Sequence, residues 1–288
     1  MENKKVLITG ANGYIGKHVT NYFLNNTDYQ VLTLDISPAS NENVSKHYQL
    51  DFLNNSDDKD LFEKLDKPDI IIHLAWKDGF NHNSNEHLKN LNLHYQFIKN
   101  MIDSNCQSIS IMGSMHEIGY FEGEVNSNTP SNPLSLYGIS KNALRQAVLS
   151  YCENKKTLIK WLRAFYITGD DKNNKSIFSK ILEMEKENKT TFPFTDGLNK
   201  YDFIDVEKLA EQISLASIQD KYNGIINVCS GKPISLKEKV EEFIKNKKLN
   251  IHPEYGVYPT RKYDSPCIFG NSETINKILE SSKYEKNN

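Results

Sequence analysis

The stretch Val6-Leu7-Ile8-Thr9-Gly10-Ala11-Asn12-Gly13-Tyr14-Ile15-Gly16 decides the fold of this 288-residue chain. A short apolar run enters a turn with three evenly spaced glycines and continues into a helical pattern. Gly10 permits the tight turn, Gly13 lets backbone N–H groups approach a pyrophosphate, and Gly16 allows the helix to pack closely on the strand. The amino end of the helix favours the same anion. The residues predicted to cradle a dinucleotide are Gly10, Asn12, Gly13, Tyr14, Ile15 and Gly16.

Apolar runs alternate with helical patterns over the first half of the chain. Strands are expected at residues 6–9, 31–34, 69–74, 108–112 and 158–162, and helices at 14–24, 88–102 and 134–151. The short continuous apolar runs suit strands that are buried on both faces. Such alternation predicts the α/β class, with a Rossmann-type doubly wound parallel sheet.

The rhythm changes after about Arg163. A polar segment at 169–174, a charged helical end at 183–189 and a loop at 191–199 precede a helix at 206–216 and a strand at 224–228. We expect a dinucleotide-binding domain over 1–169, completed by 201–229. A smaller substrate-binding lobe is expected from 170–200 and 230–288. The last residues, 281–288, are polar and are expected to fray.

Composition describes an ordinary globular protein and excludes little. Hydrophobic residues make up 38% and charged residues 25% of the chain, and the formal net charge is −2. This balance gives no electrostatic reason to expect nucleic acid or an anionic membrane, and no apolar run approaches the roughly 18 residues that would span a bilayer. The four cysteines show no C-x-x-C spacing, so no metal site is indicated. We expect a cytoplasmic enzyme without a signal peptide.

Asp35 ends the second predicted strand, 19 residues after Gly16. A carboxylate at this position can accept hydrogen bonds from an adenosine ribose and would repel a 2′-phosphate. No Lys or Arg follows in Ile36-Ser37-Pro38. NAD(H) is therefore favoured over NADP(H). The alternatives are a tight turn without a ligand for the glycines and a solvated strand-end carboxylate for Asp35.

Tyr137 and Lys141 lie four residues apart in a predicted helix, which places them on one face. Together with the glycine turn they resemble the Y-x-x-x-K pair of the short-chain dehydrogenase/reductase superfamily. A phenol is a poor base at neutral pH, and a nearby ammonium should lower its pKa into working range. The resemblance implies that Tyr137 donates or removes the proton during hydride transfer and that Lys141 also contacts the nicotinamide ribose.

Further segments resemble the extended branch of that superfamily, the nucleotide-sugar epimerases, dehydratases and reductases. Asp51-Phe52 resembles its acidic–hydrophobic pair beside the adenine, and His73-Leu74-Ala75-Trp76 resembles its H-x-A-A turn. Trp76 replaces a small residue there, so the indole is expected to narrow the site near the cofactor or to turn towards substrate. The resemblance implies that the cofactor also contacts Asp51, Phe52, Leu74, Ala75, Trp76, Tyr137 and Lys141.

The resemblance continues through the second half, with departures. Ser114 takes the position of the catalytic serine, whose hydroxyl would polarise the substrate carbonyl. His116 either contacts the sugar or fills the turn. Tyr166 replaces an asparagine that usually contacts substrate phosphate, and Arg261 lies where relatives hold a diphosphate; a surface arginine is the alternative. The residues expected at the substrate are Trp76, Met115, His116, Tyr166 and Arg261.

Three reactions share this machinery. A dehydratase needs an Asp-Glu pair directly after the serine position, where this chain has Met115 and His116, although Glu117 lies one residue further along. The resemblance therefore favours NAD(P)H-dependent reduction, or the reverse oxidation, of the 4-keto group of a nucleoside-diphosphate 4-keto-6-deoxyhexose. A dTDP-linked sugar of deoxysugar biosynthesis is preferred. An NAD-dependent 4-epimerase is the alternative, and a non-catalytic dinucleotide sensor is a third. Fold-level analogy also suggests a homodimer.

Overall fold

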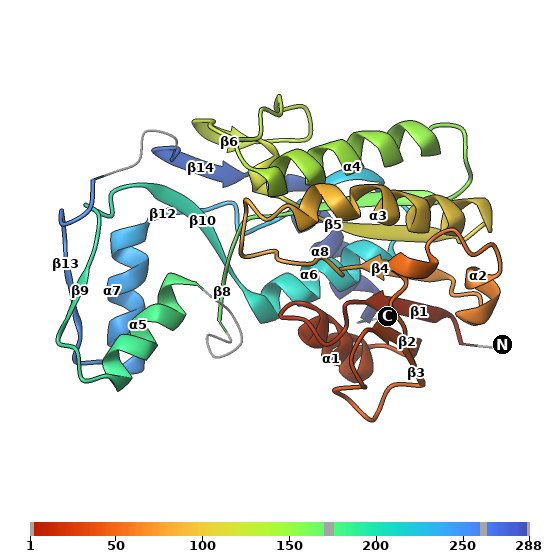
Figure 1. Cartoon of the computed structure of the whole chain (residues 1–288), viewed down its shortest axis with the longest axis horizontal. Coiled ribbons are helices and arrows are strands. Elements are labelled where there is room, and N and C mark those ends of the chain that lie inside the picture. Colours follow the sequence, from red (N-terminus) through yellow and green to blue (C-terminus); the bar gives the residue numbers. More distant parts are fainter. Residues whose placement is uncertain (1–2, 170–175, 260–263, 287–288) are drawn as a thin grey trace.

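A seven-stranded parallel sheet forms the centre of the structure, a computed structural model that describes residues 3–169, 176–259 and 264–286 (Figure 1). Its strands lie in the order β11 (Gly224–Val228), β7 (Leu158–Ala164), β5 (Ser108–Ser114), β4 (Ile70–His73), β1 (Lys5–Thr9), β2 (Gln30–Asp35) and β3 (Lys46–Gln49). All strand pairs in this sheet are parallel. The chain builds outward from β1 to β3, then crosses back and builds the other half from β4. This doubly wound order confirms the predicted fold class.

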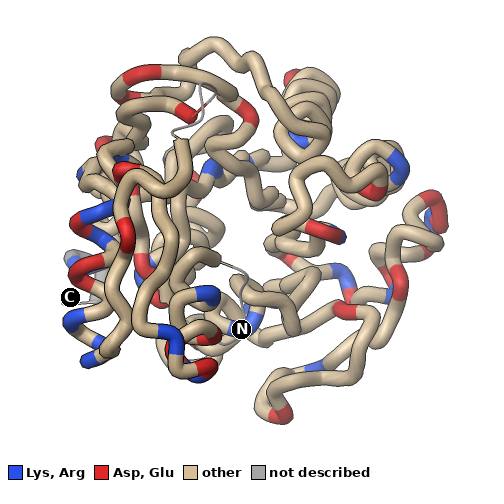
Figure 2. Tube along the Cα trace, turned by 60° about the vertical axis from the view of Figure 1, so that its left-hand side comes forward, with Lys and Arg blue, Asp and Glu red and all other residues tan. Residues whose placement is uncertain are grey.

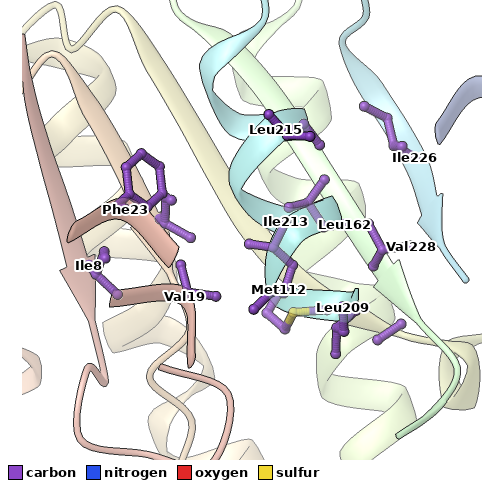
Figure 3. Close-up of a cluster of buried hydrophobic side chains, with 14 of the residues drawn as sticks. Ile8, Val19, Phe23, Met112, Leu162, Leu209, Ile213, Leu215, Ile226 and Val228 are labelled. Carbon is purple, nitrogen blue, oxygen red and sulfur yellow. The ribbon is translucent and has the colours of Figure 1, made fainter. Parts of the chain in front are cut away.

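Helices cover both faces of this sheet. One face carries α1 (Gly16–Asn26), α6 (Val206–Ile218) and α8 (Glu273–Lys286), and the other carries α2 (Leu61–Lys64), α3 (Glu86–Asp103) and α4 (Leu136–Cys152). Successive side chains of a strand point to opposite faces. Val6 and Ile8 accordingly belong to the core under α1, α6 and α8, drawn in Figure 3, whereas Leu7 belongs to the core under α3 and α4. Two buried faces explain the continuous apolar strands.

A second sheet and a small helical body extend from the main body on one side (Figure 1). The sheet has the order β12 (Pro233–Ser235), β10 (Lys200–Asp205), β14 (Cys267–Gly270), β6 (Gly123–Val125), with β8 (Tyr166–Thr168) beside β10. The small body contains α5 (Ile177–Lys186), α7 (Leu236–Lys247) and the strand pair β9 (Thr191–Pro193) and β13 (His252–Glu254). It has a core of its own, formed by Phe178, Ile181, Phe194, Val240 and Ile251.

The carboxyl-terminal helix α8 departs from the predicted domain boundary. The sequence assigns residues 230–288 to the smaller lobe, yet α8 packs against α6 and β11. Ile275, Ile278 and Leu279, three and four positions apart, enter the main core on one helical face. We therefore propose that α8 belongs to the main body. The fraying predicted for 281–288 is wrong for 281–286, because the helix continues to Lys286.

Other differences concern short elements. Helix α5 begins at Ile177, ahead of the predicted helical end, and β9 lies inside the predicted loop at 191–199. The sequence predicts neither β3 nor α2, nor the 3-10 turns η1 (Leu53–Asn55) and η2 (Met115–Glu117). Elements of three or four residues are too short to establish a hydrophobic period. Residues 170–174 of the predicted polar segment lie outside the described residues.

Charged residues of both signs are interspersed along the described chain (Figure 2). Over those same residues, none of the helices is both long enough and apolar enough to span a bilayer.

Candidate active site

The turn between β1 and α1 brings the three glycines together in a tight arch. Gly10 has a φ of +67°, and a Cβ on it would lie 2.7 Å from the Cα of Ala75. A Cβ on Gly13 would meet only the carbonyl oxygen of Gly10, at 3.1 Å, so the outer side of the arch is open. Helix α1 starts directly behind it, at Gly16. A bare backbone at the amino end of a helix fits the pyrophosphate of a dinucleotide.

Asp35 closes the side of this arch. One carboxylate oxygen accepts the N–H of Asn12 (3.1 Å), and the other accepts the N–H (3.2 Å) and hydroxyl (2.9 Å) of Ser37. The side-chain amide of Asn12 donates to the Ser37 hydroxyl (2.9 Å) and to the carbonyl of Pro38 (2.8 Å). The carboxylate is thus held beside the glycine turn by neutral donors. This is the place where an adenosine ribose would be bound.

Asp51 and Phe52 follow β3, at the next strand end. The Asp51 carboxylate accepts the N–H of Leu53 (3.2 Å) and the side-chain amide of Asn54 (2.7 Å), which fixes the first turn of η1. Phe52 is only 4% exposed, and its ring packs 4.6 Å from that of Phe97 in the core. The side chain of Phe52 is therefore a core residue, and the predicted contact of Asp51 and Phe52 with the adenine stays a prediction.

The turn after β4 lies between the glycine arch and the predicted catalytic residues, and it contacts both. Leu74 packs against the main core, and the Ala75 backbone touches Gly10. Trp76 turns its ring under Lys141, whose Nζ lies 3.7 Å from the ring centroid. The indole thus contacts the predicted catalytic lysine, and whether it narrows the site near the cofactor or faces the substrate stays a prediction.

A buried hydrogen-bond chain lies beside Trp76. The Thr9 hydroxyl pairs with His73 Nδ1 (2.9 Å), and His73 Nε2 pairs with His94 Nδ1 (3.0 Å). The ring of His94 stacks on Trp76, with centroids 4.5 Å apart and planes 16° from parallel. Burial, and next the charge of Lys141, lowers the pKa of His73 to about 3. Burial also lowers the pKa of His94 well below its usual value, so both rings are neutral at neutral pH.

Tyr137 and Lys141 project from the first turns of α4, near Ser114 at the end of β5. Burial raises the pKa of Tyr137 to about 12, against the lowering effect of its hydrogen bond with Ser114. Burial lowers the pKa of Lys141 to about 7, opposed by the charge of Glu117. The Lys141 ammonium lies 5.9 Å from the Tyr137 ring centroid and donates to the Met112 carbonyl (2.8 Å). The expected lowering of the Tyr137 pKa is therefore wrong for this structure, because burial of the phenol raises that pKa.

The side chain of Glu117 points into the protein interior. It is therefore not placed to act as the acid of a dehydratase. Its carboxylate is fully buried and accepts the N–H of Ser114 (2.7 Å) and the indole N–H of Trp161 (2.8 Å) through one oxygen. The other oxygen lies 3.3 Å from Nε of Arg145 and 3.7 Å from Nη2 of Arg163. Glu117 therefore fixes the turn that carries Ser114, the predicted catalytic serine, a function that the sequence analysis does not assign to it.

His82 is one of the side chains at this site that the sequence analysis misses, together with His87 and His94. Its carbonyl accepts the N–H of Tyr137 (2.9 Å), and its ring stacks on the phenol, with centroids 5.2 Å apart and planes 12° from parallel. His116 packs edge-on against it at 4.2 Å. Burial lowers the pKa of both imidazoles, that of His116 to about 3. The segment 77–85 has no hydrophobic period, so only its histidine offers a signal.

The remaining predicted substrate residues divide into three groups. Tyr166 lies near His116 (6.4 Å between centroids) and packs closely on Tyr201 (4.3 Å). Met115 is 6% exposed and belongs to a hydrophobic core cluster, so its side chain is structural. Arg261 lies outside the described residues. Within the described ranges, no group of three or more His, Cys, Asp or Glu side chains could hold a metal ion.

A glycine arch lies beside a half-buried tyrosine and a buried lysine, both on the switch side of a parallel sheet. This combination defines a dinucleotide-dependent oxidoreductase. Residues 6–229 match the model of the NAD dependent epimerase/dehydratase family, and the chain belongs to that family. The resemblance to the extended branch of the short-chain dehydrogenase/reductases is thereby confirmed, and the protein is an enzyme of the NAD-dependent oxidoreductase type.

Individual relatives cover nearly the whole chain. The chain is 43% identical over 268 residues to dTDP-6-deoxy-L-talose 4-dehydrogenase (NAD(+)) of Aggregatibacter actinomycetemcomitans, covering 92% of this chain and 98% of that protein. It is 26% identical to dTDP-4-dehydro-6-deoxyglucose reductase of Escherichia coli, covering 85% and 83%. The fold matches UDP-N-acetylglucosamine 4-epimerase from Methanobrevibacter ruminantium M1, in complex with UDP-N-acetylmuramic acid. There the TM-score is 0.81 at 22% identity, covering 96% and 92%.

Proposed function

We propose that this enzyme interconverts the 4-keto and 4-hydroxyl forms of a nucleoside-diphosphate 6-deoxyhexose, using NAD(H). The observation that carries the proposal is the position of Ser114, Tyr137 and Lys141 beside one another at the strand ends, next to the glycine arch. The substrate class is supported by the relative at 43% identity, a dTDP-6-deoxy-L-talose 4-dehydrogenase. A dTDP-linked sugar is the preferred substrate on the same ground.

The proton chemistry follows from the state of Tyr137. A phenol whose pKa is about 12 is protonated at neutral pH, so it is ready to donate its proton to the oxygen of a 4-keto group as that group is reduced. Ser114 would hydrogen-bond the same oxygen and stabilise its developing charge. The nicotinamide supplies or accepts the hydride. In the oxidation direction Tyr137 must first lose its proton, which a charged Lys141 favours.

The choice of NAD(H) over NADP(H) rests on Asp35. The carboxylate lies beside the glycine turn, where we propose that the adenosine ribose binds. Among the contacts described, it accepts hydrogen bonds only from Asn12 and Ser37. A 2′-phosphate placed there would meet a negative charge without a cation to offset it. We expect NADH to be used in preference to NADPH.

His116 and Tyr166 are proposed as contacts to the sugar. Burial keeps the His116 imidazole neutral, and Tyr166 offers an aromatic face beside it. Neutral aromatic side chains suit a deoxysugar, which presents a methyl group and few hydroxyls. Arg261 remains the proposed contact to the diphosphate.

Purified protein given dTDP-4-keto-6-deoxyglucose with NADH, and separately with NADPH, tests this proposal. We expect stoichiometric loss of the nicotinamide absorbance, faster with NADH. Tyr137→Phe should lower turnover by at least about 100-fold, the usual contribution of a general acid, while NADH binding changes little. Retained turnover in Tyr137→Phe would overturn the assignment.

A 4-epimerase is the alternative, since the structure of a 4-epimerase shares this fold. It would interconvert sugar-nucleotide epimers with no added reductant and would not consume NADH. Incubation with UDP-hexoses, without cofactor, separates the two reactions. Binding of NAD(H) with no turnover of any sugar would instead favour a dinucleotide sensor.

A further inference from the structure

Trp76 is held in place by a hydrogen-bond relay along one edge. Its indole N–H donates to Nδ1 of His87 (3.0 Å), and Nε2 of His87 contacts the carbonyl of Asn81 (2.8 Å). A carbonyl oxygen can only accept, so His87 carries its proton on Nε2 and leaves Nδ1 free to receive the indole N–H. One tautomer thus satisfies both bonds and fixes the plane of the indole.

The face of the same indole ring is also held in place by a stacked side chain. His94 stacks on it at 4.5 Å, and His94 is itself tied through His73 to Thr9 of β1. Rotation of Trp76 would break the bond to His87 and the stack on His94 together. The ring is therefore a rigid platform, supported by α3 and by the central sheet.

The ammonium of Lys141 rests over this platform. Its Nζ lies 3.7 Å from the indole centroid, and it donates to the Met112 carbonyl at 2.8 Å. Lys141 is 3% exposed, so little water replaces these contacts. A cation over the face of an indole is attracted by the ring quadrupole, most strongly where both are desolvated.

The other titratable groups around Lys141 do little to stabilise the positive charge of its ammonium. The carboxylate of Glu117 is the anion that acts on it, and that carboxylate is shared with Arg145 and Arg163. On β4 and α3, His73 and His94 are neutral. On its own helix, Tyr137 is protonated. The Met112 carbonyl and the indole face are the direct contacts described for the ammonium.

We propose that Trp76 is a positioning residue, which holds the ammonium of Lys141 over its indole ring and favours the charged form of that lysine. This rests on the proposed function in so far as Lys141 takes part in the reaction. Burial lowers the pKa of Lys141 to about 7. The indole face that lies 3.7 Å from Nζ should oppose that loss of charge, because a ring quadrupole attracts a cation. The large side chain at this position thus has a task that a small residue could not perform.

The first test is the pH dependence of kcat/KM for 4-keto reduction in Trp76→Leu and Trp76→Phe. Leucine keeps the site dry but has no quadrupole, so the pKa of Lys141 should fall by about one unit, a ten-fold change. Activity in Trp76→Leu should then be lower by about two-fold at about pH 6 and by about ten-fold at about pH 8, with Trp76→Phe in between. A loss of the same size at every pH would overturn the proposal and would indicate simple packing or substrate contact.

The second test needs no substrate. NMR of protein labelled with 13C-lysine, with the Lys141 signal assigned by its loss in Lys141→Met, measures the pKa directly. We expect a lower pKa in Trp76→Leu than in wild type, and no change in the control Phe80→Leu, an exposed aromatic residue of the same loop (53% exposed). An unchanged pKa in Trp76→Leu sinks the inference even if the enzyme acts on another sugar, whereas a lowered pKa without sugar turnover counts against the proposed function alone. Should Trp76→Leu not fold, His87→Ala, which removes the edge contact, should lower the same pKa.

Discussion

A buried ammonium opposes folding, and Lys141 carries one into the centre of the site. Its pKa falls from 10.5 to about 7 on burial. At pH values between about 7 and 10.5, the Lys141 side chain is protonated in the unfolded chain but has lost its proton in the folded chain. The unfolded state therefore binds more protons in this window, so the free energy of unfolding rises with pH from about 7 towards 10.5.

Lys141→Met should stabilise the fold while abolishing turnover. Below about pH 7 the native lysine is charged, and the wild-type fold bears the full free-energy cost of burying that charge. Lys141→Met should there raise the free energy of unfolding by on the order of 1–2 kcal/mol. The gain should shrink as pH rises and the native lysine loses its charge. Urea unfolding at several pH values measures it, with the exposed Lys59→Met as control. A gain that grows with pH would contradict this account.

The stack of His82 on Tyr137 should support catalysis. His82→Ala removes the ring but leaves its carbonyl to accept the Tyr137 N–H. An aromatic pair contributes about 0.5–1.5 kcal/mol, so kcat should fall about two- to ten-fold. His82→Phe, which can stack in the same way, should retain most of the activity. Equal loss in both variants would show that the imidazole nitrogens, rather than the stack, matter.

At the scale of elements, the turn η2 connects Ser114, the predicted catalytic serine, to a buried ionic cluster. Ser114 and Glu117 form a reciprocal cap, in which each side chain accepts a backbone N–H of the other end of the turn. Arg145 of α4 and Arg163 of β7 meet the same carboxylate. The cluster thus joins β5, α4 and β7 behind the site. This arrangement explains how a glutamate so close in sequence to the serine stays outside the chemistry.

Glu117→Gln should destabilise the protein without removing a catalytic group. The amide would leave two arginines facing no charge, and breaking a buried pair in this way costs roughly 3–5 kcal/mol. Thermal unfolding should show a marked loss, while turnover at low temperature, in the protein that remains folded, should persist. Normal stability with abolished turnover would return Glu117 to the list of catalytic candidates.

At the scale of the whole molecule, residues from both chain ends build one core. Ile8 of β1 and Ile275 of α8 share the cluster in which α1, α6 and α8 pack against the sheet. The hydroxyl of Tyr14 donates to the Gly169 carbonyl (2.7 Å), which ties the cofactor arch to the end of β8. The site thus depends on contacts between segments more than 150 residues apart. A homodimer, expected by analogy alone, stays a prediction.

Ile275→Ala should test whether α8 is part of the main body. Ile275 is fully buried, and truncation of such a side chain costs about 2–5 kcal/mol. Ile36→Ala serves as control, because Ile36 is 70% exposed and should tolerate the change. Chemical denaturation followed by circular dichroism compares the two. A negligible loss for Ile275→Ala would contradict the proposal that α8 belongs to the main body and would favour the smaller lobe, to which the sequence analysis assigned it.

The sequence by itself determined the fold class, the cofactor turn and the positions of Tyr137 and Lys141. These features are local: a run of apolar residues, glycines at fixed spacing, and two side chains one helical turn apart. Such signals depend on the period of one element and on the stereochemistry of one turn. Strand β11 was predicted at its observed bounds for this reason, whereas β3 and β9 are too short to show a period.

The tertiary structure alone decided the charge states and the direction of the side chains around the site. His82 reaches Tyr137 from a loop without a period, Glu117 turns inward to two arginines, and Trp76 lies under Lys141 from another element. A pKa is set by desolvation and by neighbours that are distant in the chain. Burial therefore moved the pKa of Tyr137 upward where the spacing alone had predicted a lower value. Helix α8 joined the main core for the same kind of reason, because its apolar face found partners that only the folded chain brings near.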